Sequence, residues 1–138
     1  MKAVEINQTG APEVINLKDI SLEKPNSDEV TIEQKAIGLN YIDTYHRSGL
    51  YPLKLPSGLG LEGAGIIIEV GSNVTNFKAG DKVAYAAIPL GSYSTHRNFP
   101  AAKLVKIPDG VDFDVAATLM TKGLTTYYLL HQTYKVKE

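Results

Sequence analysis

The alternation of apolar and polar residues predicts a chain built mainly of short strands. Twelve glycines and seven prolines separate the apolar segments at short intervals, which is typical of an all-β barrel or sandwich. Within residues 63–70, Ile66, Ile67 and Ile68 stand in a row, a pattern typical of a strand buried on both faces. The other predicted strands cover residues 1–6, 14–22, 30–37, 82–87, 93–99 and 104–107.

A short segment over residues 40–48 interrupts this β pattern with the signals of a helix. Asn40 is a favourable N-cap, and Asp43 three residues later completes a variant of the capping box with Asp in place of Glu or Gln. Gly49 then supplies a stop signal. The sequence therefore predicts a helix of about two turns.

A second helical pattern runs from Phe113 to about Tyr134, after Asp112 as N-cap. Gly123 is expected to divide it into two helices, since an interior glycine costs about 1 kcal/mol relative to alanine. Two apolar faces result: Phe113, Ala116, Ala117 and Met120 before the glycine, and Leu124, Tyr127, Tyr128 and His131 after it. Together with Leu129 and Leu130, the second face has more apolar surface than a small barrel covers. We therefore expect residues 113–138 to form an arm leading into a further domain, and the chain to be cut from a larger protein.

Composition and charge narrow the class of protein. The 138 residues carry a net charge of −1 and no cysteine, which suits one domain without disulfides, thiolate zinc sites or cysteine nucleophiles. The balanced charge gives no electrostatic case for nucleic acid or an anionic membrane. No stretch approaches the roughly 18 unbroken apolar residues of a membrane-spanning helix, and the N-terminus lacks a signal-peptide pattern. We expect a cytoplasmic protein.

Four stretches resemble the zinc-independent quinone oxidoreductase branch of the medium-chain dehydrogenase/reductase superfamily. They are NYIDTYHRSGLYP (40–52), PSGLGLEGAGIIIEVG (56–71), FKAGDKVAY (77–85) and MTKGLTTYYLL (120–130). The resemblance implies a mainly β, GroES-like barrel over residues 1–112, followed by the helical arm. It also implies a Rossmann domain, whose glycine-rich fingerprint this sequence does not contain.

The function that this resemblance implies is transfer of a hydride from NADPH to a quinone or a similar conjugated carbonyl. Tyrosine suits the acceptor site, because its apolar ring packs on a flat substrate and its hydroxyl donates a hydrogen bond. By the resemblance, Tyr51 and Tyr45 are the catalytic candidates. The residues that it places around the cofactor are Asn40, Tyr41, Tyr45, Thr125 and Tyr128.

For Tyr45 and Tyr51 the resemblance favours the site, whereas the other four residues can also be explained without a ligand. Asn40 serves equally as an N-cap, Tyr41 fits a buried core position better than a site, and an apolar helix face explains Thr125 and Tyr128. The acidic residues Asp43 and Glu62 are interpreted as a cap partner and a structural residue.

A zinc site is not expected. By the resemblance, Asn40 and Leu61 occupy the places where zinc-dependent relatives carry Cys and His ligands, and neither is a credible zinc ligand. The three histidines, His46, His96 and His131, are too scattered for a spacing argument.

Two other functions stay open. The chain is alternatively a non-catalytic GroES-like binding or interaction module, or a truncated gene product with no role of its own. We expect that these 138 residues alone bind NADPH weakly or not at all and are inactive. We also expect them to self-associate through the arm.

Overall fold

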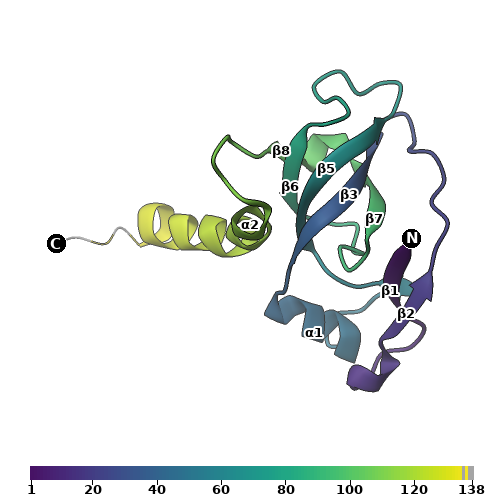
Figure 1. Ribbon diagram of the computed structural model, residues 1–138. Helices are drawn as coiled ribbons and strands as arrows, with labels where there is room; N and C mark the ends of the chain where they lie inside the picture. Colours follow the sequence, from purple (N-terminus) through teal and green to yellow (C-terminus); the bar gives the residue numbers. More distant parts are fainter. Residues whose placement is uncertain (135, 137–138) are drawn as a thin grey trace.

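Two antiparallel sheets with helices beside them make up the computed structural model, which describes residues 1–134 and 136 (Figure 1). The strands are β1 (Lys2–Ile6), β2 (Asn16–Asp19), β3 (Glu29–Gly38), β4 (Ser57–Gly58), β5 (Glu62–Val70), β6 (Lys82–Ala86), β7 (His96–Pro100) and β8 (Val105–Lys106). The helices are α1 (Tyr41–Ser48) and α2 (Phe113–Tyr127), the 3-10 helices η1 (Pro12–Val14) and η2 (Ala101–Lys103), and the π-helix η3 (Tyr128–Thr133).

The sheet topology confirms the mainly β fold class, but the expected barrel is not closed. One sheet has the order β2-β1-β4 and the other β7-β3-β5-β6-β8. An isolated bridge between Ala3 and Ser94 connects the two. Among the described residues the strands do not close into one ring, and no Rossmann domain is present.

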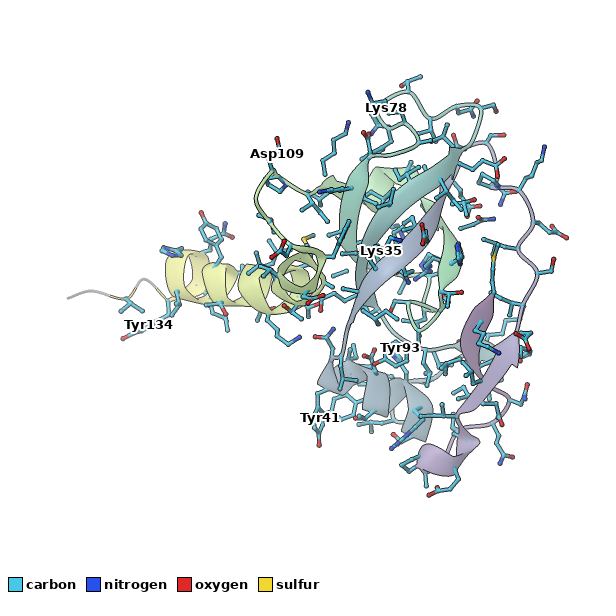
Figure 2. All side chains as sticks on the ribbon, viewed as in Figure 1. Lys35, Tyr41, Lys78, Tyr93, Asp109 and Tyr134 are labelled. Carbon is cyan, nitrogen blue, oxygen red and sulfur yellow. The ribbon has the colours of Figure 1, made fainter. Side chains whose placement is uncertain are left out.

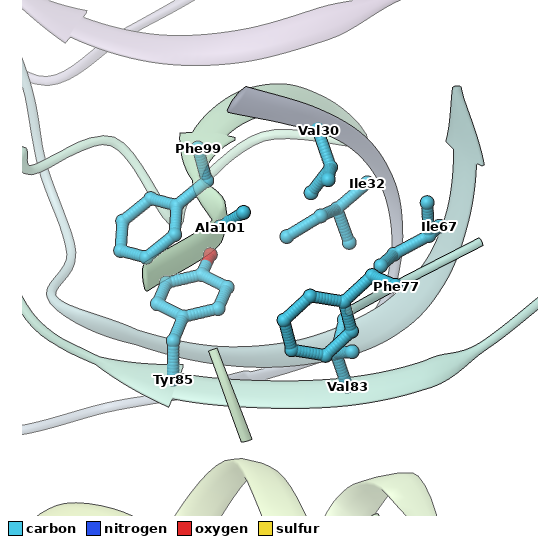
Figure 3. Close-up of a cluster of buried hydrophobic side chains, with 8 residues drawn as sticks. All are labelled: Val30, Ile32, Ile67, Phe77, Val83, Tyr85, Phe99 and Ala101. Atoms are coloured by element: carbon cyan, nitrogen blue, oxygen red, sulfur yellow. The ribbon is translucent and has the colours of Figure 1, made fainter. Parts of the chain in front are cut away.

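The main core lies on one face of the five-stranded sheet (Figure 3). The rings of Tyr85 and Phe99 stack with their centroids 4.3 Å apart, and the buried Arg97 guanidinium lies 4.6 Å from the Phe99 ring. That guanidinium also donates to the carbonyl of Pro89 at 2.7 Å. Aromatic stacking and carbonyl contacts thus accommodate a charge that is costly to bury unpaired.

The isoleucine run of β5 is not buried on both faces as predicted. Ile67 is fully buried, whereas Ile68 is 44% exposed. The face of β5 that carries Ala64 is covered by α2, because Ala64 packs with Ala116 and Ala117. That cover ends before Ile68. Continuous apolar sequence alone did not reveal where a covering helix stops.

The α1 helix begins and ends as the sequence predicts. The backbone N–H of Asn40 donates to Asp43 Oδ2 at 3.0 Å, which is the carboxylate half of the capping box. Gly49 adopts a left-handed conformation with φ 87°, and its N–H donates to the carbonyl of Tyr45 at 3.1 Å. A residue with a Cβ is strained in that conformation, so the glycine defines the end of the helix.

The expected break at Gly123 is wrong, because α2 continues through it to Tyr127. A Cβ at Gly123 would come 2.7 Å from Leu119 Cδ1, so the leucine of the preceding turn occupies this space. The change in the helix comes later, at the start of the π-helix η3. Figure 1 shows the last turns of α2 and η3 projecting away from both sheets.

Within the part of the chain that the structure describes, no helix is both long and apolar enough to cross a lipid bilayer.

Candidate functional site

Three tyrosines form a row along α1 and the loop that follows it. The ring centroids of Tyr41 and Tyr45 lie 5.3 Å apart, as do those of Tyr45 and Tyr51. His46 flanks the row, 5.9 Å from Tyr51. Helical spacing places residues 41 and 45 on one face, and the backbone N–H of Tyr51 returns to the Tyr45 carbonyl at 3.2 Å. The structure therefore brings the two catalytic candidates into contact.

Tyr41 corrects one expectation. It is 75% exposed at the start of α1 (Figure 2), so it is not a core residue. Tyr51 is 46% exposed and Tyr45 is half-buried. Tyrosine rings left open to solvent beside one another form a surface suited to a flat, partly apolar ligand.

A hydrogen bond connects the buried side of α1 to the segment before β7. The Tyr93 hydroxyl donates to Asp43 Oδ2 at 2.7 Å, and Figure 2 shows Tyr93 between α1 and the larger sheet. Burial raises the pKa of Tyr93, and its hydrogen bond to the Asp43 carboxylate raises the pKa further. Asp43 is thus more than a cap partner, because it also anchors the helix to the core.

Asn40, at the start of α1, lies in a polar cluster that also includes Glu62 of β5 and Lys122 of α2. The Asn40 Nδ2 donates to Glu62 Oε2 at 2.7 Å, and Lys122 Nζ donates to Asn40 Oδ1 at 3.0 Å. Glu62 is fully buried, and its Oε1 accepts the backbone N–H of Thr121 at 2.7 Å. Asn40 therefore combines the role of an N-cap with a second set of contacts.

The arm residues Thr125 and Tyr128 are exposed, on α2 and η3 respectively. Among the described residues, no hydrogen bond or ring contact connects them to the tyrosine row. Lys122, one turn before Thr125, is where the arm contacts the Asn40 cluster. Their assignment to the cofactor remains a prediction.

Sequence reasoning missed Lys122 and Tyr93 as contributors to this site, and it undervalued Glu62. The signal for Lys122 was available only in part, inside the segment MTKGLTTYYLL. In residues 1–134 and 136, no group of three or more His, Cys, Asp or Glu side chains is arranged to hold a metal ion.

A comparison with protein families decides the relationship. Residues 26–109, more than half of the chain, match the family model of the alcohol dehydrogenase GroES-like domain. The chain belongs to this family. As a GroES-like domain it has the mainly β architecture that the four sequence stretches implied.

Several curated proteins similar to this GroES-like chain are quinone oxidoreductases. It is 54% identical over 137 residues to the quinone oxidoreductase of Pseudomonas aeruginosa, covering 99% of this chain and 42% of that protein. It is 49% identical over 135 residues to quinone oxidoreductase 1 of Escherichia coli, covering 97% of this chain and 41% of that protein. The resemblance to the quinone oxidoreductase branch of the superfamily is confirmed.

Among solved structures, the Escherichia coli quinone oxidoreductase complexed with NADPH is similar with a TM-score of 0.96 and 48% identity. That match covers 99% of this chain and 42% of the solved one. The GroES-like chain therefore spans less than half the length of these relatives and corresponds to their N-terminal part.

Proposed function

We propose that this GroES-like chain is the substrate-side domain of an NADPH-dependent oxidoreductase that reduces a quinone or a similar conjugated carbonyl. The observation that carries the proposal is the open row of Tyr41, Tyr45 and Tyr51 next to the Asn40 cluster. The quinone oxidoreductases that resemble the chain over nearly all its length give independent support. Residues 1–112 form this domain in our proposal, and 113–138 form the arm.

The residues present suit the nicotinamide half of NADPH and a flat acceptor. NADPH, when bound, supplies the hydride. The acceptor ring packs on the apolar rings of Tyr45 and Tyr51, and their hydroxyls donate hydrogen bonds to its oxygens. Asn40, with Tyr41 and Tyr45, orients the nicotinamide from α1, and Thr125 and Tyr128 complete that side from the arm. Reduction of the quinone also requires a proton at oxygen, which a tyrosine hydroxyl delivers from solvent.

The isolated chain is expected to be inactive. A phosphate-binding glycine-rich turn at a helix N-terminus is what normally holds a dinucleotide, and the sequence contains no such fingerprint. The remaining contacts are too few to offset an ordering cost of about 4 kcal/mol or more. Steady quinone-dependent oxidation of NADPH by these 138 residues, abolished by Tyr51→Ala, would contradict this expectation.

Quinone binding tests the proposal without requiring turnover. Titration of the isotopically labelled chain with a soluble benzoquinone is expected to shift the ring resonances of Tyr45 and Tyr51 in a saturable way. Tyr51→Ala is expected to weaken binding several-fold. Tyr134→Ala, which removes a more exposed tyrosine ring on the arm, serves as the control. Shifts confined to the arm, or no binding at all, would favour the non-catalytic module or truncated product.

Two further parts of the proposal concern the metal and the location. We propose that the chain binds no zinc, because Asn40 and Leu61 stand at the two ligand positions of zinc-dependent relatives. About one zinc per chain after dialysis would overturn this. A cytoplasmic location is also proposed, and cell fractionation of the natural producer checks it.

We propose that the isolated chain pairs with a second copy of itself through its arm. The large apolar side chains toward the end of α2 and in η3 are each about half exposed: Leu124, Tyr127, Tyr128, Leu129 and Leu130. Grouped apolar exposure of this kind is unusual for a monomer. In an isolated chain, the same segment of a second copy is the apolar surface available to cover these side chains.

A further inference from the structure

The side chain of Asn40 is held at both ends of its carboxamide. Its Nδ2 donates to Glu62 Oε2 at 2.7 Å, and its Oδ1 accepts from Lys122 Nζ at 3.0 Å. A carboxylate only accepts hydrogen bonds and an ammonium only donates them. If the Asn40 amide were flipped, its oxygen would face the Glu62 carboxylate and its N–H groups would face the Lys122 ammonium, so neither hydrogen bond could form. The two partners together permit one orientation of the amide.

Glu62 is built into the fold for this contact and for one other. It is fully buried on β5, and its second oxygen, Oε1, receives the backbone N–H of Thr121 at 2.7 Å. Lys122 Nζ lies 3.8 Å from Oε2 and compensates the charge. Each buried carboxylate oxygen thus has a donor, as a buried charge requires. The carboxylate connects β5 to the start of α1 and to α2.

The backbone of β3 leaves room for this arrangement at Gly38. A Cβ at that position would come 2.6 Å from Glu62 Oε2 and 2.1 Å from the Ala117 carbonyl oxygen. Both distances are far below van der Waals contact. The strand end, the carboxylate and α2 therefore meet at one tightly packed point.

The cluster has hydrogen-bond donors left over. One Nδ2 proton of Asn40 goes to Glu62, and within the part of the chain that the structure describes no acceptor takes the other. Lys122 Nζ donates to Asn40 Oδ1 and to the Leu39 carbonyl at 3.3 Å. The third Nζ proton is left over, because Lys122 Nζ lies 3.8 Å from Glu62 Oε2, beyond hydrogen-bond distance. The Lys122 side chain is 56% exposed.

These spare donors lie at the end of α1 where the tyrosine row begins with Tyr41. An amide N–H beside an ammonium group suits an oxygen with partial or full negative charge. The N-terminus of α1 adds a small positive potential there. A carbonyl oxygen on a flat ring meets both requirements, because its ring packs on tyrosine while its oxygen accepts from the cluster.

We propose that Glu62 is a positioning residue and that Lys122 has two roles, positioning and binding. Both hold the Asn40 carboxamide so that its free N–H, together with the Lys122 ammonium, receives the carbonyl oxygen of a ring-shaped ligand. The identity of that ligand rests on the proposed function. Both the nicotinamide carboxamide and a quinone carry such an oxygen, and the experiment separates them.

The orientation of Asn40 is tested first, without a ligand. In the ¹⁵N-labelled chain, the side-chain NH₂ resonances of Asn40 are expected to be well separated and slow to rotate. Lys122→Met keeps the aliphatic stem and removes the donor, so these resonances are expected to shift and rotate faster. Lys122→Arg restores a donor and is expected to return them toward their original positions. Lys103→Met, at another lysine that donates to a carbonyl, is the matched control and should change nothing at Asn40.

A variant at Glu62 provides a second, independent arm. In Glu62→Gln, one side-chain oxygen becomes an NH₂ group that must face either the Thr121 N–H or the Asn40 Nδ2. The Asn40 resonances are expected to move even though the volume is almost unchanged. If this buried variant does not fold, the exposed Lys122→Met still decides the question. Asn40 resonances that are identical in wild type and Lys122→Met would overturn the proposal.

The ligand arm uses reduced nicotinamide mononucleotide and a soluble benzoquinone in separate titrations. The one that contacts the cluster is expected to shift the Asn40 NH₂ resonances and to bind Lys122→Met at least threefold more weakly, with the fold intact. A ligand that shifts Tyr45 and Tyr51 but leaves Asn40 unmoved contradicts this inference and leaves the proposed function standing. Two ligands that move neither the tyrosines nor Asn40 contradict both.

Discussion

The two halves of α2 share one helix but have opposite surroundings. In the first half, Ala116 and Ala117 are buried against Ala64 and Ala84 of the larger sheet. In the second half, Leu124 is 59% exposed and Tyr127 56% exposed. The small residues thus lie where backbone packs on backbone, and the large apolar residues lie where nothing in the described chain covers them. The first half of α2 therefore belongs to the core, and the second half leaves its large apolar side chains exposed.

The largest expected effect separates the core from the arm. Phe99→Ala removes a fully buried ring stacked on Tyr85, and we expect a loss of about 3–5 kcal/mol in the free energy of unfolding. Leu124→Ala, in the exposed half of α2, is expected to change it by less than about 0.5 kcal/mol. Urea unfolding of both variants measures the difference. Both variants are measured well below the concentration at which the chain pairs, so that comparable losses would show that the arm is covered within a single chain.

Association through the arm is the next effect. Full burial of one leucine is worth about 1.5–3 kcal/mol, so we expect the chain to dimerise at tens of micromolar and Leu130→Glu to make it monomeric. Sedimentation velocity measures this. Leu17→Glu, at an exposed leucine of β2, should leave the dimer intact. A monomer that Leu130→Glu does not change would mean that the arm needs no partner.

Two glycine substitutions, one on β3 facing the first half of α2 and one in its second half, sharpen the comparison. At Gly38 an added Cβ meets the Ala117 carbonyl, whereas at Gly123 it meets the end of the exposed Leu119 side chain. We expect Gly38→Ala to lower the free energy of unfolding by about 1–3 kcal/mol, because the helix must move away from the sheet. Gly123→Ala is expected to be neutral or stabilising by up to about 1 kcal/mol. Thermal and urea unfolding compare the two, and equal losses would contradict the tight packing at Gly38.

The smallest effect is a pH dependence at the core side of α1. Burial and the Asp43 carboxylate raise the pKa of Tyr93, so the folded chain keeps this proton above pH 10, where an unfolded tyrosine loses it. The unfolded state then binds fewer protons, and stability falls as the pH rises. Tyr93→Phe is expected to show a shallower fall above pH 10 in urea unfolding. Tyr134→Phe accounts for the loss of one tyrosine, and equal slopes in wild type and Tyr93→Phe would contradict the assignment.

Local signals explain what was predicted correctly. Asn40, Asp43 and Gly49 bracket α1 as expected, because a cap and a stop depend on residues a few positions apart. The contact of Tyr45 with Tyr51 follows from the same short segment. Three other expectations failed: the break at Gly123, the two-sided burial of Ile66 to Ile68, and a buried Tyr41. Each depended on which other parts of the chain pack against a helix or strand, and the residues of that helix or strand do not specify this.

The sequence by itself determined most of the strands, the bounds of α1, the family and the tyrosine row, since periodicity, capping residues and motifs are carried by neighbouring positions. Only the tertiary structure decided the open arrangement of the two sheets and the contacts that make Asn40 more than a cap. Glu62 is 22 positions from Asn40, Lys122 is 82 positions away, and Tyr93 is 50 positions from Asp43. No local pattern encodes such separations. The Asn40 contacts arise when β3, β5 and α2 pack together at Gly38 and bring a buried carboxylate within reach of its donors, and the Tyr93 contact arises when α1 packs on the segment before β7.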